Sequence, residues 1–227
     1  MVKTPTRSIP LFLENGDRLS SAEFERRSAL LPESQKVELI EGVVYLAADV
    51  RYHSHAQPHG IMMGWLGVYA SATPGVEFVD NPTVRLDLDN QPQPDAVLRI
   101  DRSRGGQSSI SDDDYLEGAP ELVIEIAASS AAYDLYEKKR VYRRNGVQEY
   151  IIWQVYDRRI SWFSLEEGEY IELSPDEQGT IESCIFPGLA LDIEATIDLD
   201  LGRVLTVLQS QFNIPAHQEL IDRLASF

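Results

Sequence analysis

Two short aliphatic runs, each carrying a carboxylate, limit most strongly what this chain can fold into. Residues 95–100 and 122–127 are almost continuously apolar, whereas polar and apolar side chains alternate over residues 83–88. Continuous runs are typical of central strands covered on both faces, and alternation indicates a strand with one solvated face. Over residues 59–72, apolar side chains recur at helical spacing. The sequence therefore predicts an α/β fold with a central sheet.

The rest of the chain contains further helix and strand patterns and no internal repeat. A short helix should follow Ser20, which has the capping-box spacing to Glu23. Residues 102–118 are rich in Gly, Ser and Asp and should form a surface loop. We also expect hairpins over residues 37–46 and 159–173, a helix over 134–146, a strand over 150–155 and an amphipathic helix over 201–212.

Length and composition indicate one globular domain in a reducing compartment. The chain has 227 residues, of which 43% are hydrophobic and 25% are charged. Cys184 is the only cysteine, which excludes an intrachain disulfide and a cysteine-clustered zinc site. No apolar run approaches the ~20 residues that cross a bilayer, and the first residues lack the apolar segment of a signal peptide. We therefore expect a cytoplasmic protein with no membrane partner.

The net charge argues against a nonspecific nucleic-acid binder. With 37 acidic and 20 basic residues, the formal charge of -17 repels a polyanion at long range. Exposed charges are screened beyond ~8–10 Å, so the charges close to a site matter more than the total. One segment is strongly basic and contains Lys138, Lys139, Arg140, Arg143 and Arg144.

The carboxylates of Asp95 and Glu125 are the first candidates for chemistry. A carboxylate within a core strand is costly unless it is paired or holds a cation. If the two strands are neighbours, both side chains could converge within ~4–6 Å and supply the oxygen ligands that Mg²⁺ accepts. The alternative, equally supported by spacing alone, is that Glu125 points to a solvated face and Asp95 caps a turn.

Lys138 lies four residues after Asp134 and shares a helix face with it and with Tyr142. A lysine beside two carboxylates and a metal can orient or deprotonate an attacking water. On spacing alone, an exposed ion pair between Lys138 and Asp134 is the better interpretation.

Three histidines, His53, His55 and His59, lie close together in the sequence, but only His55 and His59 share helical i,i+4 spacing. Solvated or capping roles are therefore favoured over a histidine metal site.

Several ordered motifs resemble one known family. They are Val37-Glu38-Leu39-Ile40-Glu41-Gly42, Pro94-Asp95, the block from Ala119 to Ile126, the spacing Asp134-Lys138-Tyr142, and Gly146-Val147-Gln148-Glu149-Tyr150. Together they are similar to the Uma-two family of restriction endonuclease-like proteins, within the PD-(D/E)XK nuclease superfamily. The resemblance covers residues 20–195, which leaves an N-terminal extension over 1–19 and a C-terminal helical extension over 196–227. It implies an α/β, restriction endonuclease-like fold with a mixed central sheet flanked by helices.

The resemblance also implies roles for particular residues. Asp95 and Glu125 would bind Mg²⁺ or Mn²⁺, the carbonyl of Ile126 would add a third ligand, and Glu38 would be a further acidic member of the site. The superfamily's usual lysine would stand two residues after the second acid, where this chain has Ala127. The resemblance places the lysine function at Lys138 instead.

These observations predict a magnesium-dependent endonuclease that hydrolyses phosphodiester bonds, with DNA as substrate, by means of a metal-activated water. Asp95, Glu125 and Lys138 would be catalytic, and Lys139 and Arg143 would contact the substrate. We also expect a homodimer that uses the apolar face of the C-terminal amphipathic helix. The alternative is a catalytically inactive nuclease-like module for binding or assembly, which Ala127 and the acidic net charge favour.

Overall fold

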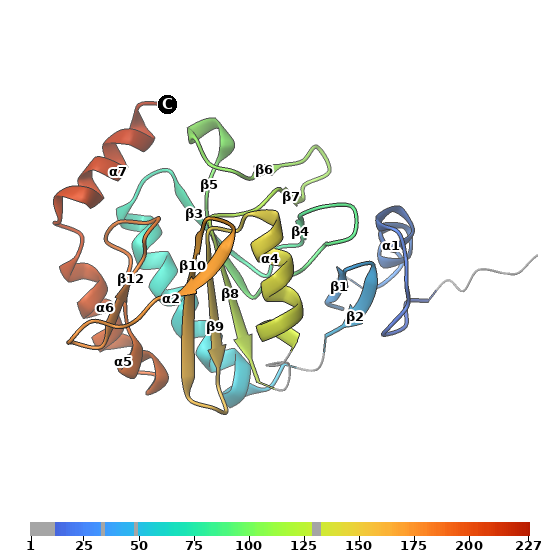
Figure 1. Ribbon diagram of the computed structural model, residues 1–227, viewed down its shortest axis with the longest axis horizontal. Helices are drawn as coiled ribbons and strands as arrows, with labels where there is room; N and C mark the ends of the chain where they lie inside the picture. The colour runs from blue at the N-terminus through green and yellow to red at the C-terminus, as the bar shows by residue number, and fades with distance from the viewer. Residues whose placement is uncertain (1–11, 33–34, 48–49, 129–132) are drawn as a thin grey trace, which may run out of the picture.

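A six-stranded mixed sheet lies at the centre of the protein, whose computed structural model describes residues 12–32, 35–47, 50–128 and 133–227 (Figure 1). Within this sheet β8 and β9 run parallel, and the other neighbouring strands are antiparallel. In spatial order the strands are β11 (Glu169–Glu172), β10 (Arg159–Glu166), β9 (Glu149–Gln154), β8 (Leu122–Ala127), β5 (Ala96–Ile100) and β3 (Val76–Asp80).

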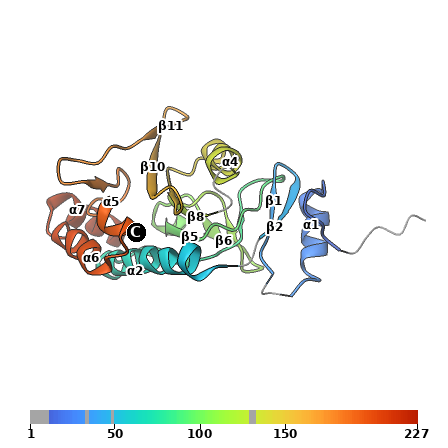
Figure 2. The same cartoon turned by 90° about the horizontal axis from the view of Figure 1, so that it is seen from below.

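The two aliphatic runs form adjacent central strands, β5 and β8, and every residue of both is buried. Their side chains alternate between two hydrophobic clusters, one on each face of the sheet. Helix α2 (Gln57–Ala72) covers one face, and the π-helix η3 (Asp134–Lys138) with α4 (Lys139–Asn145) covers the other (Figure 2). The predicted fold class, a mixed sheet flanked by helices, is confirmed.

A smaller unit beside the sheet consists of α1 (Ser21–Ser28) and the hairpin of β1 (Val37–Ile40) and β2 (Val43–Leu46) (Figure 1). The predicted hairpin is confirmed, and its turn residues, Glu41 and Gly42, have φ values of 52° and 70°. Positive φ at both central residues is the requirement of the tight hairpin turn that matches the strand twist. Leu13 packs in the same small cluster, while residues 1–11 of the predicted N-terminal extension lie outside the described residues.

Two predicted segments differ from the structure. Of the strand expected over 83–88, only β4 (Val84–Arg85) is present. The expected surface loop 102–118 contains a 3-10 turn, η2 (Arg102–Arg104), and two short strands, β6 (Ser109–Ile110) and β7 (Leu116–Glu117). Strand β7 lies between β6 and β4 and pairs with both. A two-residue strand has no detectable periodicity, because it is stabilised by its neighbours and not by its own pattern.

The C-terminal region adds the strand pair β12 (Thr180–Glu182) and β13 (Ala190–Asp192) and the helices α5 (Ile193–Ile197), α6 (Leu201–Ser210) and α7 (Pro215–Ala225). Helix α6 packs against α2, and its apolar side chains Val204 and Leu208 belong to the main core. The apolar face that was expected to serve a dimer interface is therefore already covered within one chain. In the described part of the chain, no helix is long and apolar enough to span a membrane.

Candidate active site

The strand register places Asp95 and Glu125 opposite each other at one end of strands β5 and β8. Strands β5 and β8 pair Ala96 with Ile124 and Val97 with Val123, so continuing the register by one residue sets Asp95 opposite Glu125. Side chains opposite each other on antiparallel strands have Cβ atoms about 4.5–5.5 Å apart. Both acids are only 3% exposed, which excludes the alternative in which Glu125 faces solvent.

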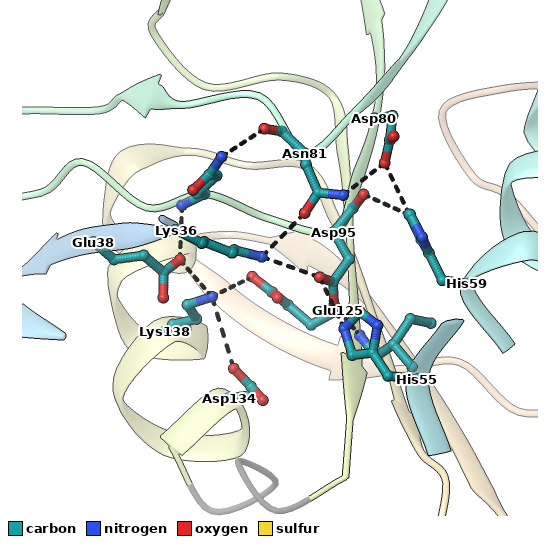
Figure 3. Close-up of polar contacts among 12 residues, drawn as sticks. Lys36, Glu38, His55, His59, Asp80, Asn81, Asp95, Glu125, Asp134 and Lys138 are labelled. Atoms are coloured by element: carbon teal, nitrogen blue, oxygen red, sulfur yellow. Dashed lines mark hydrogen bonds and ion pairs between the residues drawn. The ribbon is translucent and has the colours of Figure 1, made fainter. Parts of the chain in front are cut away.

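Asp95 is surrounded by hydrogen-bond donors (Figure 3). Its Oδ2 accepts from the backbone N–H of Ile126 at 2.7 Å, and its Oδ1 lies 3.1 Å from Lys36 Nζ and 3.2 Å from His55 Nε2. Burial opposes ionisation of Asp95, but the His55 hydrogen bond and the Lys36 charge outweigh it and lower the pKa of Asp95 below its ordinary value. Asp95 is therefore a carboxylate at neutral pH.

Glu125 has a different environment. Its Oε1 accepts from Lys138 Nζ at 2.8 Å and from the Tyr142 hydroxyl at 2.7 Å. Burial raises the pKa of Glu125, and the nearby carboxylates of Asp134, Asp95 and Glu38 raise it further, against the attraction of Lys138. Both of these hydrogen bonds end on the same oxygen, Oε1.

Lys138 occupies the centre of an acidic cluster rather than the surface. Its ammonium lies 2.7 Å from Glu38 Oε1, 2.8 Å from Glu125 Oε1 and 3.8 Å from Asp134 Oδ1, and its side chain is 3% exposed. The exposed ion pair favoured by spacing alone is therefore wrong. Burial disfavours the ammonium, but the surrounding carboxylates prevail and raise its pKa well above the ordinary value.

The helix geometry explains how Lys138 reaches Glu125. The segment from Asp134 to Lys138 is a π-helix, and the regular α-helix begins only at Lys139. A π-helical turn is wider than an α-turn, and such turns occur frequently at functional sites. The same segment leads on to Tyr142, whose hydroxyl meets the same oxygen of Glu125.

The cation on Asp95 is Lys36, which the sequence patterns did not indicate. We expected Lys138 to approach both acids, but it contacts Glu125 while Lys36 contacts Asp95. Lys36 immediately precedes β1 and lies two residues before Glu38, so both side chains project from the same face of the hairpin. That period-two relation to Glu38 is the one sequence signal that could have identified Lys36.

The histidines contact Asp95 but do not form a metal cluster. His55 comes from the π-helix η1 (Tyr52–Ala56), and His59 Nε2 lies 2.9 Å from the Asp95 carbonyl oxygen and 3.2 Å from Asp80 Oδ1. His53 instead pairs with Gln57 at 3.1 Å. His55 and His59 thus position Asp95 (Figure 3).

The donor set fits a magnesium-type ion. Among the described residues, no group of three or more His, Cys, Asp or Glu side chains is arranged to hold a metal. Mg²⁺ does not require such a cage, since it commonly uses one or two carboxylates and keeps several waters. Within a strand, the N–H and C=O of one residue point to the same neighbour, so the Ile126 carbonyl faces the side on which its N–H meets Asp95. Two carboxylates and one carbonyl are suitable hard ligands.

The basic segment that follows the site is largely neutralised by internal contacts. The Lys139 ammonium lies 3.3 Å from the centre of the Phe163 ring, and Arg143 pairs with Glu169 at 2.6 Å. Arg140 and Arg144 pair with Glu137 at 2.7 Å and with Glu41 at 2.8 Å, respectively. A phosphate that binds here must compete with these partners, which lowers the gain from each cation.

Comparisons with known proteins show the family and the fold of the chain. The sequence profile of the family Uma2, described as "Putative restriction endonuclease", matches residues 21–194. A crystal structure described as a "putative nuclease belonging to DUF820", from Anabaena variabilis ATCC 29413, is similar with a TM-score of 0.60 and 14% sequence identity. The alignment covers 80% of this chain and 98% of the Anabaena chain, and at this identity the similarity shows a shared fold. No curated protein matches the sequence.

Proposed function

Since the chain belongs to the Uma2 family of restriction endonuclease-like proteins, we propose that it hydrolyses phosphodiester bonds of DNA with a divalent metal held by Asp95 and Glu125. The observation that carries this proposal is the register that sets two buried carboxylates opposite each other, next to a buried lysine. Mg²⁺ or Mn²⁺ is the proposed ion, with the Ile126 carbonyl as a third ligand.

Each of the residues around the proposed metal site has a defined part in this proposal. A bound ion would lower the pKa of a water and neutralise charge on the scissile phosphate. Ile126 N–H and His55 fix the orientation of Asp95, and Lys138 and Tyr142 fix that of Glu125. Lys138 also supplies positive charge beside the attacking water, where negative charge develops during hydrolysis.

We propose that Glu38 fixes the position of the Lys138 ammonium. Its Oε1 lies 2.7 Å from the ammonium and also accepts from the backbone N–H of Gln93 at 2.7 Å. Gln93 stands two residues before Asp95, so Glu38 connects the lysine with the segment that leads into β5. Lys139 and Arg143 remain proposed substrate contacts, and their replacement should lower DNA affinity without affecting the chemical step.

A homodimer is part of the proposal, because two copies related by a twofold axis present one site to each strand of a duplex. The interface must use a surface other than the apolar face of α6, which is buried in the main core. Light scattering at micromolar concentration tests this point, and a monomeric mass would contradict it.

The alternative function is a nuclease-like module that binds or assembles without cleaving. The specific observation in its favour is that Lys36 and Lys138 already neutralise the acids within the chain. A charge cluster satisfied in this way is stable without a metal.

A metal-dependent cleavage assay separates the two functions. Wild-type protein is incubated with single-stranded, double-stranded and branched DNA, in Mg²⁺, in Mn²⁺ and in chelator. We expect cleavage only with metal, and loss of cleavage in Asp95→Asn, which keeps the shape of the side chain and removes its charge. Absence of cleavage in wild type on every substrate would support the binding module.

A further inference from the structure

The two lysines of the site differ in their freedom to move. Lys138 is 3% exposed and lies within 4 Å of three carboxylates, so its ammonium is held firmly in place. Lys36 is 25% exposed and has one carboxylate partner, Asp95, and one amide partner, Asn81, at 3.2 Å. Of the two, Lys36 is the one that can exchange its partner for an incoming group.

Lys36 and a metal compete for the same carboxylate oxygen. Asp95 Oδ2 is occupied by the N–H of Ile126, whereas Oδ1 carries both Lys36 and His55. An ion that binds Asp95 either takes the place of the ammonium on Oδ1 or lies within a few ångströms of it. At about 4 Å, two unit charges of equal sign interact unfavourably by about 4 kcal/mol near a protein surface, and a divalent ion makes this larger.

The Lys36 ammonium lies between Asn81 and Asp95, and its side chain is 25% exposed, so a released ammonium could meet a group that arrives from solvent (Figure 3). An anionic phosphodiester is the natural new partner, because a compact ammonium with three donors is a common ligand for phosphate oxygens.

We propose that Lys36 is an exchangeable cation, which holds Asp95 while the metal is absent and contacts the scissile phosphate once the metal is bound. This inference rests on the proposed metal-dependent hydrolysis and adds a residue to it. The metal-free protein is then protected from leaving Asp95 as an uncompensated buried charge.

The test uses Lys36→Met, which keeps the length of the side chain and removes its charge. Metal affinity is measured by titration calorimetry with Mg²⁺ and with Mn²⁺ in the absence of DNA, and cleavage is measured at saturating metal. We expect the metal affinity to rise by about tenfold or more, because a competing cation is gone. Cleavage should fall by ~10²-fold, the size expected for loss of a charge-stabilising group.

Two further variants complete the design. Lys36→Arg keeps the charge and should restore the weaker metal affinity and most of the cleavage. Arg26→Met removes one positive charge from α1, where Arg26 pairs only with Glu23 in the described structure, and should change neither quantity. Thermal unfolding of each variant establishes that the fold is intact.

The outcomes separate the inference from the function on which it rests. Wild type that neither binds metal nor cleaves refutes the proposed function, and the inference with it. Wild type that does both, with a Lys36→Met variant of unchanged or weaker metal affinity, refutes the role of Lys36 alone. Tighter metal binding with undiminished cleavage also overturns the proposal, because the phosphate contact is then absent.

Discussion

Two glutamates on the neighbouring parallel strands are both buried, yet their surroundings have opposite character. Glu125 on β8 meets a lysine and other carboxylates. Glu149 on β9 meets neutral donors: Ser183 donates to its Oε2 at 2.7 Å, and the N–H of Cys184 donates to its Oε1 at 2.6 Å. The register pairs Leu122 with Glu149, three residues before Glu125, so the two glutamates lie on opposite faces of the sheet.

The comparison shows what burial alone can and cannot indicate. Burial raises the pKa of Glu149 to about 7, and it also raises the pKa of Glu125. A perturbed pKa is therefore common to both positions. What distinguishes Glu125 is the second carboxylate opposite it and the charged partners around both. Glu149 holds the turn at Ser183 and Cys184, whereas Glu125 belongs to the proposed metal site.

The largest expected effect is the loss of the cation beside Glu125. Lys138→Met leaves Glu38, Glu125 and Asp134 without the ammonium that neutralises them. We expect the free energy of unfolding to fall by ~3–5 kcal/mol in urea titrations, and cleavage to be lost. The loss of stability should be greater at pH 8 than at pH 5. At pH 8 the carboxylates stay ionised and repel one another, whereas at pH 5 protonation can relieve this repulsion. A change below ~1 kcal/mol would show that the cluster is solvated in solution.

The second effect is on cleavage and compares the two glutamates directly. Glu125→Gln should reduce the rate at saturating metal by ~10²-fold or more, because a proposed metal ligand is replaced by a weaker neutral one. Glu149→Gln should leave that rate near the wild-type value, since its partners are Ser183 and Cys184. Initial rates on one DNA substrate measure both. Equal losses of cleavage rate in the two variants would contradict a catalytic role that belongs to Glu125 and not to Glu149.

The third effect is the pH dependence of stability due to Glu149. Its pKa is about 7 in the folded chain and 4.5 as the ordinary value, so the folded state binds the proton more tightly. The protonated Glu149 side chain therefore adds ~3 kcal/mol to the free energy of unfolding below about pH 4.5. This contribution is lost as the pH rises through about 7. Unfolding of wild type and Glu149→Gln between pH 4 and 8 should show a flatter profile in the variant. Parallel profiles would contradict this assignment.

The smallest effect concerns the neutral partner of Glu149. Ser183→Ala removes the hydrogen bond to Glu149 and the two that Ser183 Oγ accepts from the N–H groups of Ile185 and Phe186, while the N–H of Cys184 still donates to the carboxyl group. We expect a destabilisation of ~1–2 kcal/mol and unchanged metal affinity. A loss as large as that of Lys138→Met would mean that the two sites do not differ in the way described.

The sequence indicated the central strands and the two acids well, and the connections between distant segments poorly. The aliphatic runs predicted β5 and β8, because full burial on both faces leaves few polar positions. The motif resemblance then pointed to Asp95, Glu125, Glu38 and Lys138, and the structure brings these four side chains into one region (Figure 3).

The motif resemblance does not assign Lys36 or His55 to the site. Their contacts with Asp95 span 59 and 40 residues of sequence and depend on the order of strands in the sheet, which no local pattern encodes. The π-helical turn before Lys139 was also missed, since helical periodicity does not distinguish it from an α-helix over five residues.

The packing of α6 on α2 has a consequence for synthesis of the chain on the ribosome. Helix α2 leaves the ribosome early, but the residues that cover its outer side, Val204 and Leu208, belong to the last part of the chain. During translation at ~5–20 residues per second, α2 therefore remains exposed for many seconds with an apolar surface. We expect that a chain that ends before residue 200, in which this apolar surface stays uncovered, aggregates rather than folds.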